Sequence, residues 1–163
     1  MRNGLGGAGG VEIELARAIR ERASFLLKDL LLETDVPGEA PRSPTIVNGY
    51  LPPKRAKDGS EVPFVIVRPN AGKTDTTGFT RVTVKLIIVA YSEAFDGHEY
   101  AMLVLQRLRI GLMEQPTLDQ RYRMELPFTW DLFDDQPYPN WQLVITTEWT
   151  VPTPQEIPDE GVY

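Results

Sequence analysis

The chain has no cysteine and only one histidine, His98, among its 163 residues. Without cysteine it can form no disulfide, no thiol nucleophile and no cysteine-ligated zinc site. One histidine cannot supply a two-histidine metal site, and a catalytic triad would have to run through His98. The absence of cysteine agrees with a reducing compartment, and the glycine-rich start, Met1 to Gly10, has no apolar leader core. We therefore expect a soluble, cytoplasmic protein.

Long apolar runs and an excess of positive charge are also missing. The longest apolar run, Leu86 to Tyr91, is far shorter than the roughly 20 residues that a membrane-spanning helix needs. Lys and Arg number 17 against 23 Asp and Glu, which gives a net charge of −6. Because binding to nucleic acid phosphates needs a basic surface, this balance argues against nucleic acid as the main partner. We expect no membrane partner either.

What is present fits one globular domain. Hydrophobic residues make up 42% and charged residues 25% of the chain, close to globular averages. We expect residues 1–10 to be a flexible lead-in, residues 11–151 a single domain and residues 152–163 an extended tail. The proline-rich stretch Thr34–Pro63 and the segment Pro69–Thr80 are predicted to be long flexible loops.

Two helices are predicted from apolar residues at helical spacing. The first spans Val11–Glu33, which contains neither glycine nor proline. The second spans Gly97–Gln115 and ends before Pro116. Asp96 and Glu99 stand at capping-box spacing at its start.

Alternating and β-branched segments predict the strands. They lie at Ile46–Leu51, Phe64–Arg68, Arg81–Tyr91, Arg121–Trp130 and Trp141–Val151. Pro127 cannot donate a ladder hydrogen bond, so it marks an edge or a bulge. Strands that occur in successive pairs favour an α+β fold, in which a mainly antiparallel sheet packs against two helices.

Carboxylates offer the only candidate chemistry. Asp131, Asp134 and Asp135, with Glu125, could serve an acid–base enzyme if they shared a cleft. Asp96, His98 and Glu99 could bind a metal, but helix capping already explains the two acids. The interpretation that we adopt has no catalytic residue, no cofactor and no metal site.

Aromatic residues and acids gather around the last predicted turn. We predict that Phe133, Asp134, Asp135, Tyr138 and Trp141 form an interaction surface, since Tyr and Trp are enriched at protein interfaces. The alternative is that the turn packs locally on its own domain.

From Pro63 onward the segments follow one another in a recognisable order. The residues that carry this pattern are Pro63-Phe64-Val65-Ile66-Val67-Arg68-Pro69, Val82-Thr83-Val84-Lys85-Leu86-Ile87-Ile88, Gln106-Arg107-Leu108-Arg109, Arg121-Tyr122-Arg123-Met124-Glu125-Leu126-Pro127, Asp135-Gln136-Pro137-Tyr138-Pro139-Asn140-Trp141 and Thr146-Thr147-Glu148-Trp149-Thr150-Val151-Pro152. In this order and spacing the chain resembles the tail terminator, or tail completion, proteins of long-tailed phages and prophages of Gram-positive bacteria.

The resemblance implies a structural virion protein that performs no chemistry. It implies a ring, typically a homohexamer, at the head-proximal end of the tail tube, in contact with the major tail tube protein and the head–tail connector. DNA would pass through the lumen without specific binding, and the ring would be assembled in the host cytoplasm and reside in the virion tail or neck. The alternatives are another neck or head–tail connector component, a carboxylate-based enzyme and a small-ligand binding module.

Overall fold

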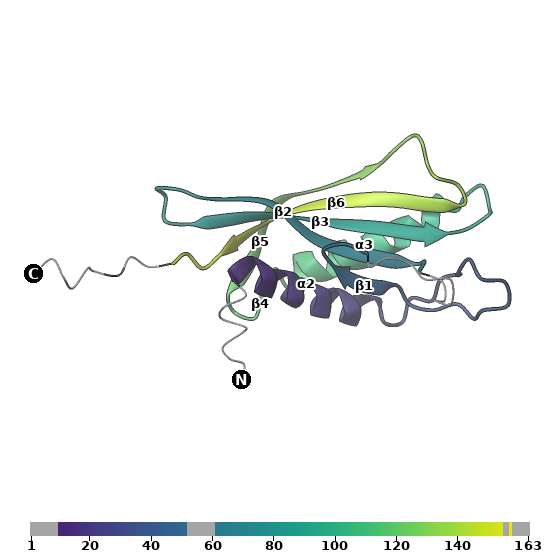
Figure 1. Ribbon diagram of the computed structural model, residues 1–163, viewed down its shortest axis with the longest axis horizontal. Coiled ribbons are helices and arrows are strands. Elements are labelled where there is room, and N and C mark those ends of the chain that lie inside the picture. The colour runs from purple at the N-terminus through teal and green to yellow at the C-terminus, as the bar shows by residue number, and fades with distance from the viewer. Residues whose placement is uncertain (1–9, 52–60, 155–156, 158–163) are drawn as a thin grey trace, which may run out of the picture.

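The fold is a six-stranded sheet with two helices packed on one face (Figure 1). The computed structural model describes residues 10–51, 61–154 and 157. The sheet order is β1-β2-β3-β6-β5-β4, and only the pair β1–β2 is parallel. The prediction of a single α+β domain with a mainly antiparallel sheet and two helices is thereby confirmed. In chain order the elements are α2 (Val11–Leu27), β1 (Thr45–Asn48), β2 (Phe64–Thr74), β3 (Thr80–Tyr91), α3 (His98–Glu114), β4 (Thr117–Leu118), β5 (Tyr122–Leu132) and β6 (Asn140–Val151).

One apolar core lies between the helices and the sheet. Every second residue of β3 and β6, as in Leu86 and Ile145, is buried on the helix side. Leu15 of α2 and Leu108 of α3 are fully buried in the same cluster. Full burial of such a side chain contributes about 1.5–3 kcal/mol, so this layer dominates the stability of the fold.

The first helix is shorter than its composition predicts. It ends at Leu27, whereas the apolar spacing continues to Glu33. Leu32 forms an isolated bridge with Arg42 instead, and its side chain is buried in the core. Burial of Leu32 in this loop outweighs the helix propensity of the preceding residues.

The second helix agrees with its predicted range, but its predicted cap is wrong. Gly97 occupies the N-cap position, and no side chain caps the helix there. Asp96 takes part through its backbone carbonyl, which accepts the N–H of Glu99 at 2.9 Å. The capping box that the sequence spacing suggests is therefore not formed.

The segment predicted as a loop between β2 and β3 is largely a β-hairpin, which we call the arm (residues 69–80). After a register shift next to Pro69, its strands remain paired as far as Thr74 and Thr80. Lys73 lies opposite Arg81. Gly72 allows this close pairing, because a Cβ atom there would lie 2.9 Å from the carbonyl oxygen of Arg81. In Figure 1 the arm projects at the end of the sheet opposite the β5–β6 turn.

An irregularity interrupts β5 where Pro127 stands, as predicted. The register with β6 shifts between Glu125 and Thr129. The shift breaks the expected alternation, so Leu126 is 67% exposed while Tyr122 and Met124 are buried. Strand β4, which pairs only with the start of β5, was not expected from the sequence.

The sheet face away from the helices, called the outer face here, is only partly covered. A second apolar cluster of Val62, Phe64, Ile66 and Val89 lies there at the β1–β2 side. Across the rest of the face the strands present mainly Thr, Lys and Glu side chains. Within the described residues no helix is both long and apolar enough to cross a membrane.

Candidate functional site

The β5–β6 turn, residues 133–139, is held in shape by its own hydrogen bonds. The side-chain amide of Gln136 donates to the carbonyl oxygens of Phe133 at 2.8 Å and Gln142 at 3.1 Å. Its side-chain oxygen accepts the backbone N–H of Gln142 at 2.6 Å. Gln136 thus bridges both arms of the turn, which the sequence alone did not indicate.

The turn is also fastened to the connection between β3 and α3. The hydroxyl of Tyr138 donates to the carbonyl oxygen of Glu93 at 2.7 Å, and the indole N–H of Trp141 donates to that of Ser92 at 2.9 Å. The rings of Tyr138 and Trp141 meet edge to face with centroids 6.0 Å apart. This fixed attachment positions the turn with little conformational freedom left to lose on docking.

Three aromatic rings nevertheless face solvent at this end of the molecule. Phe133 is 53% exposed and Tyr138 58%, while Phe95 of the β3–α3 connection is fully exposed. Phe95 was missed from the sequence, although an aromatic residue beside Asp96 in a short connection was the available signal. Trp141 is half-buried, so it serves more to hold the turn than to offer a free surface.

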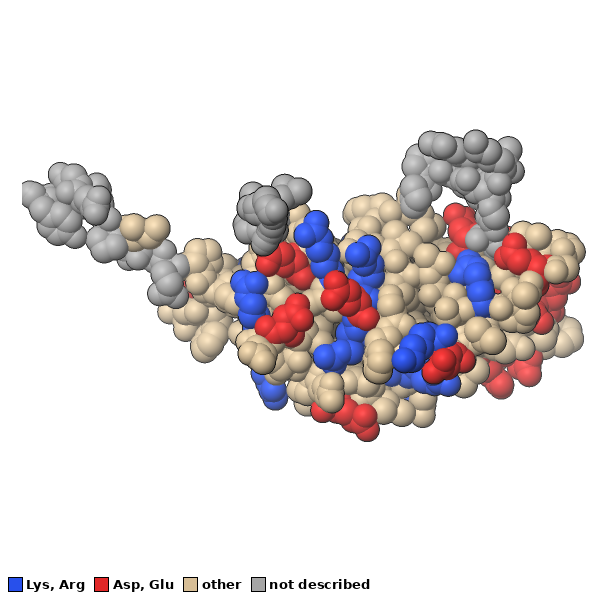
Figure 2. All heavy atoms as spheres, turned by 90° about the horizontal axis from the view of Figure 1, so that it is seen from below, with Lys and Arg blue, Asp and Glu red and all other residues tan. Residues whose placement is uncertain are grey.

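Acids surround these rings. Asp134 and Asp135 are exposed and form no hydrogen bond or ion pair with any residue that the structure describes. Glu93 accepts a short hydrogen bond from Tyr91, and this bond, with the nearby Asp35 and Glu33, raises the pKa of Tyr91 to about 12. We call this region the acidic end; its residues are Glu33, Asp35, Glu39, Glu93, Asp96, Asp134 and Asp135. Figure 2 shows acidic side chains gathered at this end, with Lys and Arg mostly over the middle of the helix layer.

The other predicted acids lie apart from one another. Asp131 is exposed on β5, whereas Glu125 accepts a hydrogen bond from the hydroxyl of Thr150 at 2.9 Å. His98 is half-buried and packs near Trp141, with ring centroids 6.1 Å apart. Among the described residues no group of three or more His, Asp or Glu is placed to hold a metal ion.

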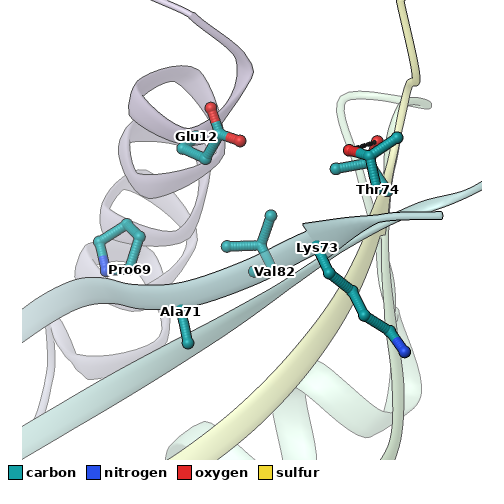
Figure 3. A pocket seen from close by; sticks show the side chains of 8 residues that line it. Glu12, Pro69, Ala71, Lys73, Thr74 and Val82 are labelled. Atoms are coloured by element: carbon teal, nitrogen blue, oxygen red, sulfur yellow. Dashed lines mark hydrogen bonds between the residues drawn. The ribbon is translucent and has the colours of Figure 1, made fainter.

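A shallow groove of about 450 Å³ lies between the start of α2 and the arm (Figure 3). Glu12 faces it from the helix, and Thr74 and Val82 line it from the strands. In the close view Lys73 points away from Glu12, to the other side of the strands. The groove thus offers one carboxylate and two threonine hydroxyls, those of Thr74 and Thr80, which hydrogen-bond to each other at 2.7 Å, while the lysine is presented on the outer face.

Comparisons with known proteins find likeness in structure but none in sequence. No protein-family model matches the sequence, and no curated protein matches it. A solved structure of the virion of a native gene transfer agent particle contains a chain that aligns with this one at a TM-score of 0.48 and 12% identity. The alignment covers 84% of this chain and 93% of that chain.

Proposed function

We propose that the protein is a structural virion component of the tail terminator type. It forms a ring of identical subunits, expected to be a hexamer, that caps the head-proximal end of the tail tube and docks to the head–tail connector. It performs no chemistry, and DNA passes through the ring without specific recognition. The order of motifs from Pro63 onward supports this assignment.

The observation that carries the proposal is the preorganised, solvent-facing β5–β6 turn. Phe133 and Tyr138 present aromatic surface that a monomer gains nothing by exposing, and interfaces are enriched in such residues. The hydrogen bonds of Gln136 and Tyr138 hold that surface in place before any partner arrives. A rigid aromatic surface with unpaired acids beside it suits specific, salt-sensitive docking to another protein.

The same turn argues against the carboxylate enzyme. A catalytic carboxylate pair works best in a desolvated site that raises one pKa. Asp131, Asp134 and Asp135 are all exposed instead, and Glu125 is engaged by Thr150. These carboxylates are placed to orient a partner by charge.

The test is to purify the protein, measure its mass in solution and image it with isolated tail tubes from a phage or prophage that encodes it. We expect rings seated at one end of each tube and tubes that stop growing when the protein is added. Rings that bind the connector but never the tube would indicate a different neck component. A protein that binds neither structure would overturn the proposal.

A further inference from the structure

Basic residues face each other directly across the β2–β3 hairpin. On the outer face Arg68 lies opposite Lys85, and Lys73 lies opposite Arg81. Like charges at directly opposed positions of an antiparallel pair destabilise it. We call these four residues the basic row.

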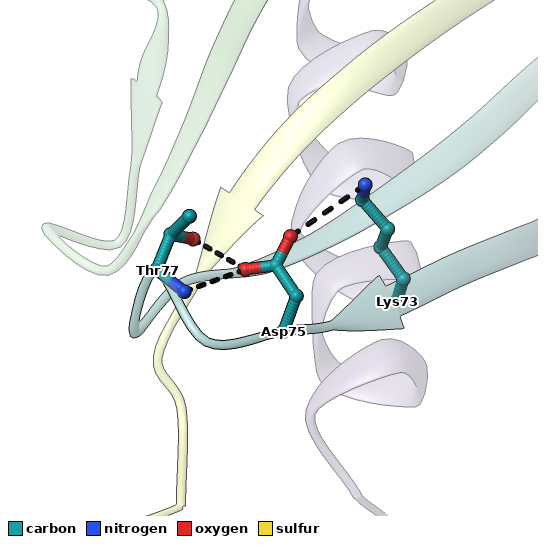
Figure 4. A network of polar contacts seen from close by, with 3 residues as sticks. All are labelled: Lys73, Asp75 and Thr77. Atoms are coloured by element: carbon teal, nitrogen blue, oxygen red, sulfur yellow. Dashed lines mark hydrogen bonds and ion pairs between the residues drawn. The ribbon is translucent and has the colours of Figure 1, made fainter.

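Two members of the basic row have local partners. The guanidinium of Arg68 stacks over the ring of Tyr50 at 3.9 Å, and its Nε donates to the carbonyl oxygen of Gly49 at 3.0 Å. Lys73 forms an exposed ion pair with Asp75 at 3.5 Å (Figure 4). These contacts draw both side chains away from their opposed bases.

The side chains of Arg81 and Lys85 make no hydrogen bond or ion pair within the described part of the chain. On the other neighbouring strand, β6, Glu148 lies directly opposite Thr83, between the two bases. Its carboxylate instead accepts the hydroxyl of Thr83 at 2.9 and 3.1 Å. Two bases on a rigid central strand are therefore left available to an external anionic group.

The strands that carry the basic row also separate it from the acidic end. Arg81 and Lys85 lie in the first half of strand β3, and its last residue, Tyr91, bonds to Glu93 of the acidic end. Strand β6 starts at the β5–β6 turn and ends beside the arm, where Val151 pairs with Thr80. The bases of β3 thus lie in the half of the strand nearer the arm, and the acids lie beyond its other end. Figure 1 shows the arm and the β5–β6 turn at opposite ends of these strands.

We propose that the basic row receives the acidic end of a second copy of this chain. Arg81 and Lys85 of one copy would face Asp134 and Asp135 of the next, with Phe133 and Tyr138 in the apolar centre of the contact. This inference deepens the proposed function and rests on it, because it names the surfaces through which the ring closes. A contact between two different surfaces of identical subunits is head-to-tail, and it closes into a ring when the rotation allows.

Paired charge reversals test this contact. The first variant carries Arg81→Glu and Lys85→Glu, so that both its surfaces are acidic; the second carries Asp134→Lys and Asp135→Lys, so that both are basic. The first variant should remain folded, because the attraction of each new glutamate to Lys73 or Arg68 across the hairpin offsets its repulsion from Glu148, which lies diagonally beside both positions. Sedimentation velocity at low and high salt measures the association of each variant alone and of the equimolar mixture.

We expect each variant alone to associate at least about tenfold more weakly than the wild type, because like charges then meet. The mixture should recover wild-type association, since every contact between alternating variants is again complementary. Arg17→Glu with Arg20→Glu, on the exposed face of α2, makes the same change in net charge and should leave association unchanged.

The other outcomes separate this inference from the proposed function. If both variants still form rings as the wild type does, or if their mixture does not associate, the proposed contact is wrong while the proposal of a ring is unaffected. A wild-type chain that stays monomeric at every concentration and on tail tubes would overturn both. A third outcome is that reversal of Arg81 and Lys85 abolishes retention on duplex DNA but leaves self-association intact. The basic row would then bind a polyanion and not a second copy, which would overturn the inference.

Discussion

Gly97, at the start of α3, lies against the indole ring of Trp141, at the start of β6. A Cβ atom on Gly97 would overlap Nε1 of that ring and lie 2.8 Å from the Cβ of Ser92. The ring is also held in place, because its N–H donates to the carbonyl oxygen of Ser92 at 2.9 Å. This close approach joins the helix layer to the strand that begins at the β5–β6 turn.

Gly97→Ala should therefore destabilise the domain by about 1–3 kcal/mol, since the indole has no free direction in which to move. Urea unfolding followed by tryptophan fluorescence measures the change. Gly111→Ala is the control: its Cβ would lie 2.3–2.9 Å from the Cδ and Cγ atoms of Leu26, a flexible aliphatic side chain that can change rotamer. In the interior of α3 alanine also improves helix propensity by about 1 kcal/mol. Equal losses in the two variants would contradict this reading of the Gly97 contact.

A buried hydrogen-bond chain inside the sheet gives a second prediction. The hydroxyl of Thr147 donates to the carbonyl oxygen of Val84 at 2.8 Å and accepts the indole N–H of Trp149 at 2.8 Å. Both Thr147 and Trp149 are fully buried. Thr147→Val keeps the shape but leaves the indole N–H unpaired, so the free energy of unfolding should fall by about 1–3 kcal/mol.

Thr146→Val serves as the control for this change. Thr146 lies on the outer face, and its hydroxyl makes no hydrogen bond within the described residues. Valine suits a strand at least as well as threonine, so its effect on unfolding should be near zero. Similar losses for the two variants would show that the buried chain contributes nothing specific.

The tip of the arm gives a prediction about pH. The hydroxyl of Thr77 bonds to Asp75, and the backbone N–H of Thr77 donates to the same carboxylate at 2.9 Å (Figure 4). These two bonds, helped by Lys73, hold the pKa of Asp75 below its ordinary value. A lowered folded pKa means that the stabilisation is fully present above about pH 4 and is lost as the pH falls through the folded pKa. In an NMR titration Thr77→Ala should move the pKa of Asp75 back up toward its ordinary value, because the hydroxyl bond is lost while the backbone bond stays; an unchanged midpoint would exclude the Thr77 hydroxyl as a cause.

The sequence predicts the central strands well because their alternation is dictated by a single buried face. Val82, Val84 and Leu86 point into the core, and a shift of one residue would place all of them on the outer face. The same logic locates α3 from Leu105 and Leu108. Where only one face of an element is buried, the spacing of its apolar residues is sufficient to predict the element.

Contacts between distant segments explain what could not be predicted. The early end of α2 depends on Leu32 reaching Arg42, and the arm depends on Gly72 packing against the backbone of Arg81. The candidate site is similar, since Tyr138 is held by Glu93, 45 residues earlier. The sequence indicated which residues gather at the turn, but their attachment and the exposure of Phe95 depend on tertiary structure.

The acids of the turn should contribute to assembly through charge alone. Asp134→Asn with Asp135→Asn removes two exposed, unpaired charges, so assembly should weaken modestly at low salt. The difference from the wild type should shrink as salt rises, because added salt screens exposed charges; the Debye length is about 8 Å at physiological ionic strength. Glu21→Gln with Glu114→Gln, exposed on the two helices, controls for net charge. An effect that persists unchanged at high salt would point to a structural role for these aspartates.

Tyr138 is the residue at which docking and local packing can be told apart. Its hydroxyl stabilises the turn by donating to the backbone carbonyl of Glu93, whereas the residue is 58% exposed and its ring is available to a partner. Tyr138→Ala removes both and should weaken assembly by about 1–2 kcal/mol if the ring is a buried anchor in the complex. Tyr138→Phe keeps the ring and loses only the hydrogen bond, so it should retain most of that affinity.

Unfolding measurements on the isolated protein complete the test. Because the ring is largely exposed in the monomer, both variants should remain folded, and Tyr138→Phe should lose no more than about 0.5–1.5 kcal/mol for its hydrogen bond. If Tyr138→Ala unfolds the monomer, the residue belongs to the core and the turn is packed for its own stability. If Tyr138→Ala stays folded and completes tails as efficiently as the wild type, the ring is no anchor. Weakened assembly from a folded Tyr138→Ala, with near-normal assembly of Tyr138→Phe, is the combination that a preorganised docking residue requires.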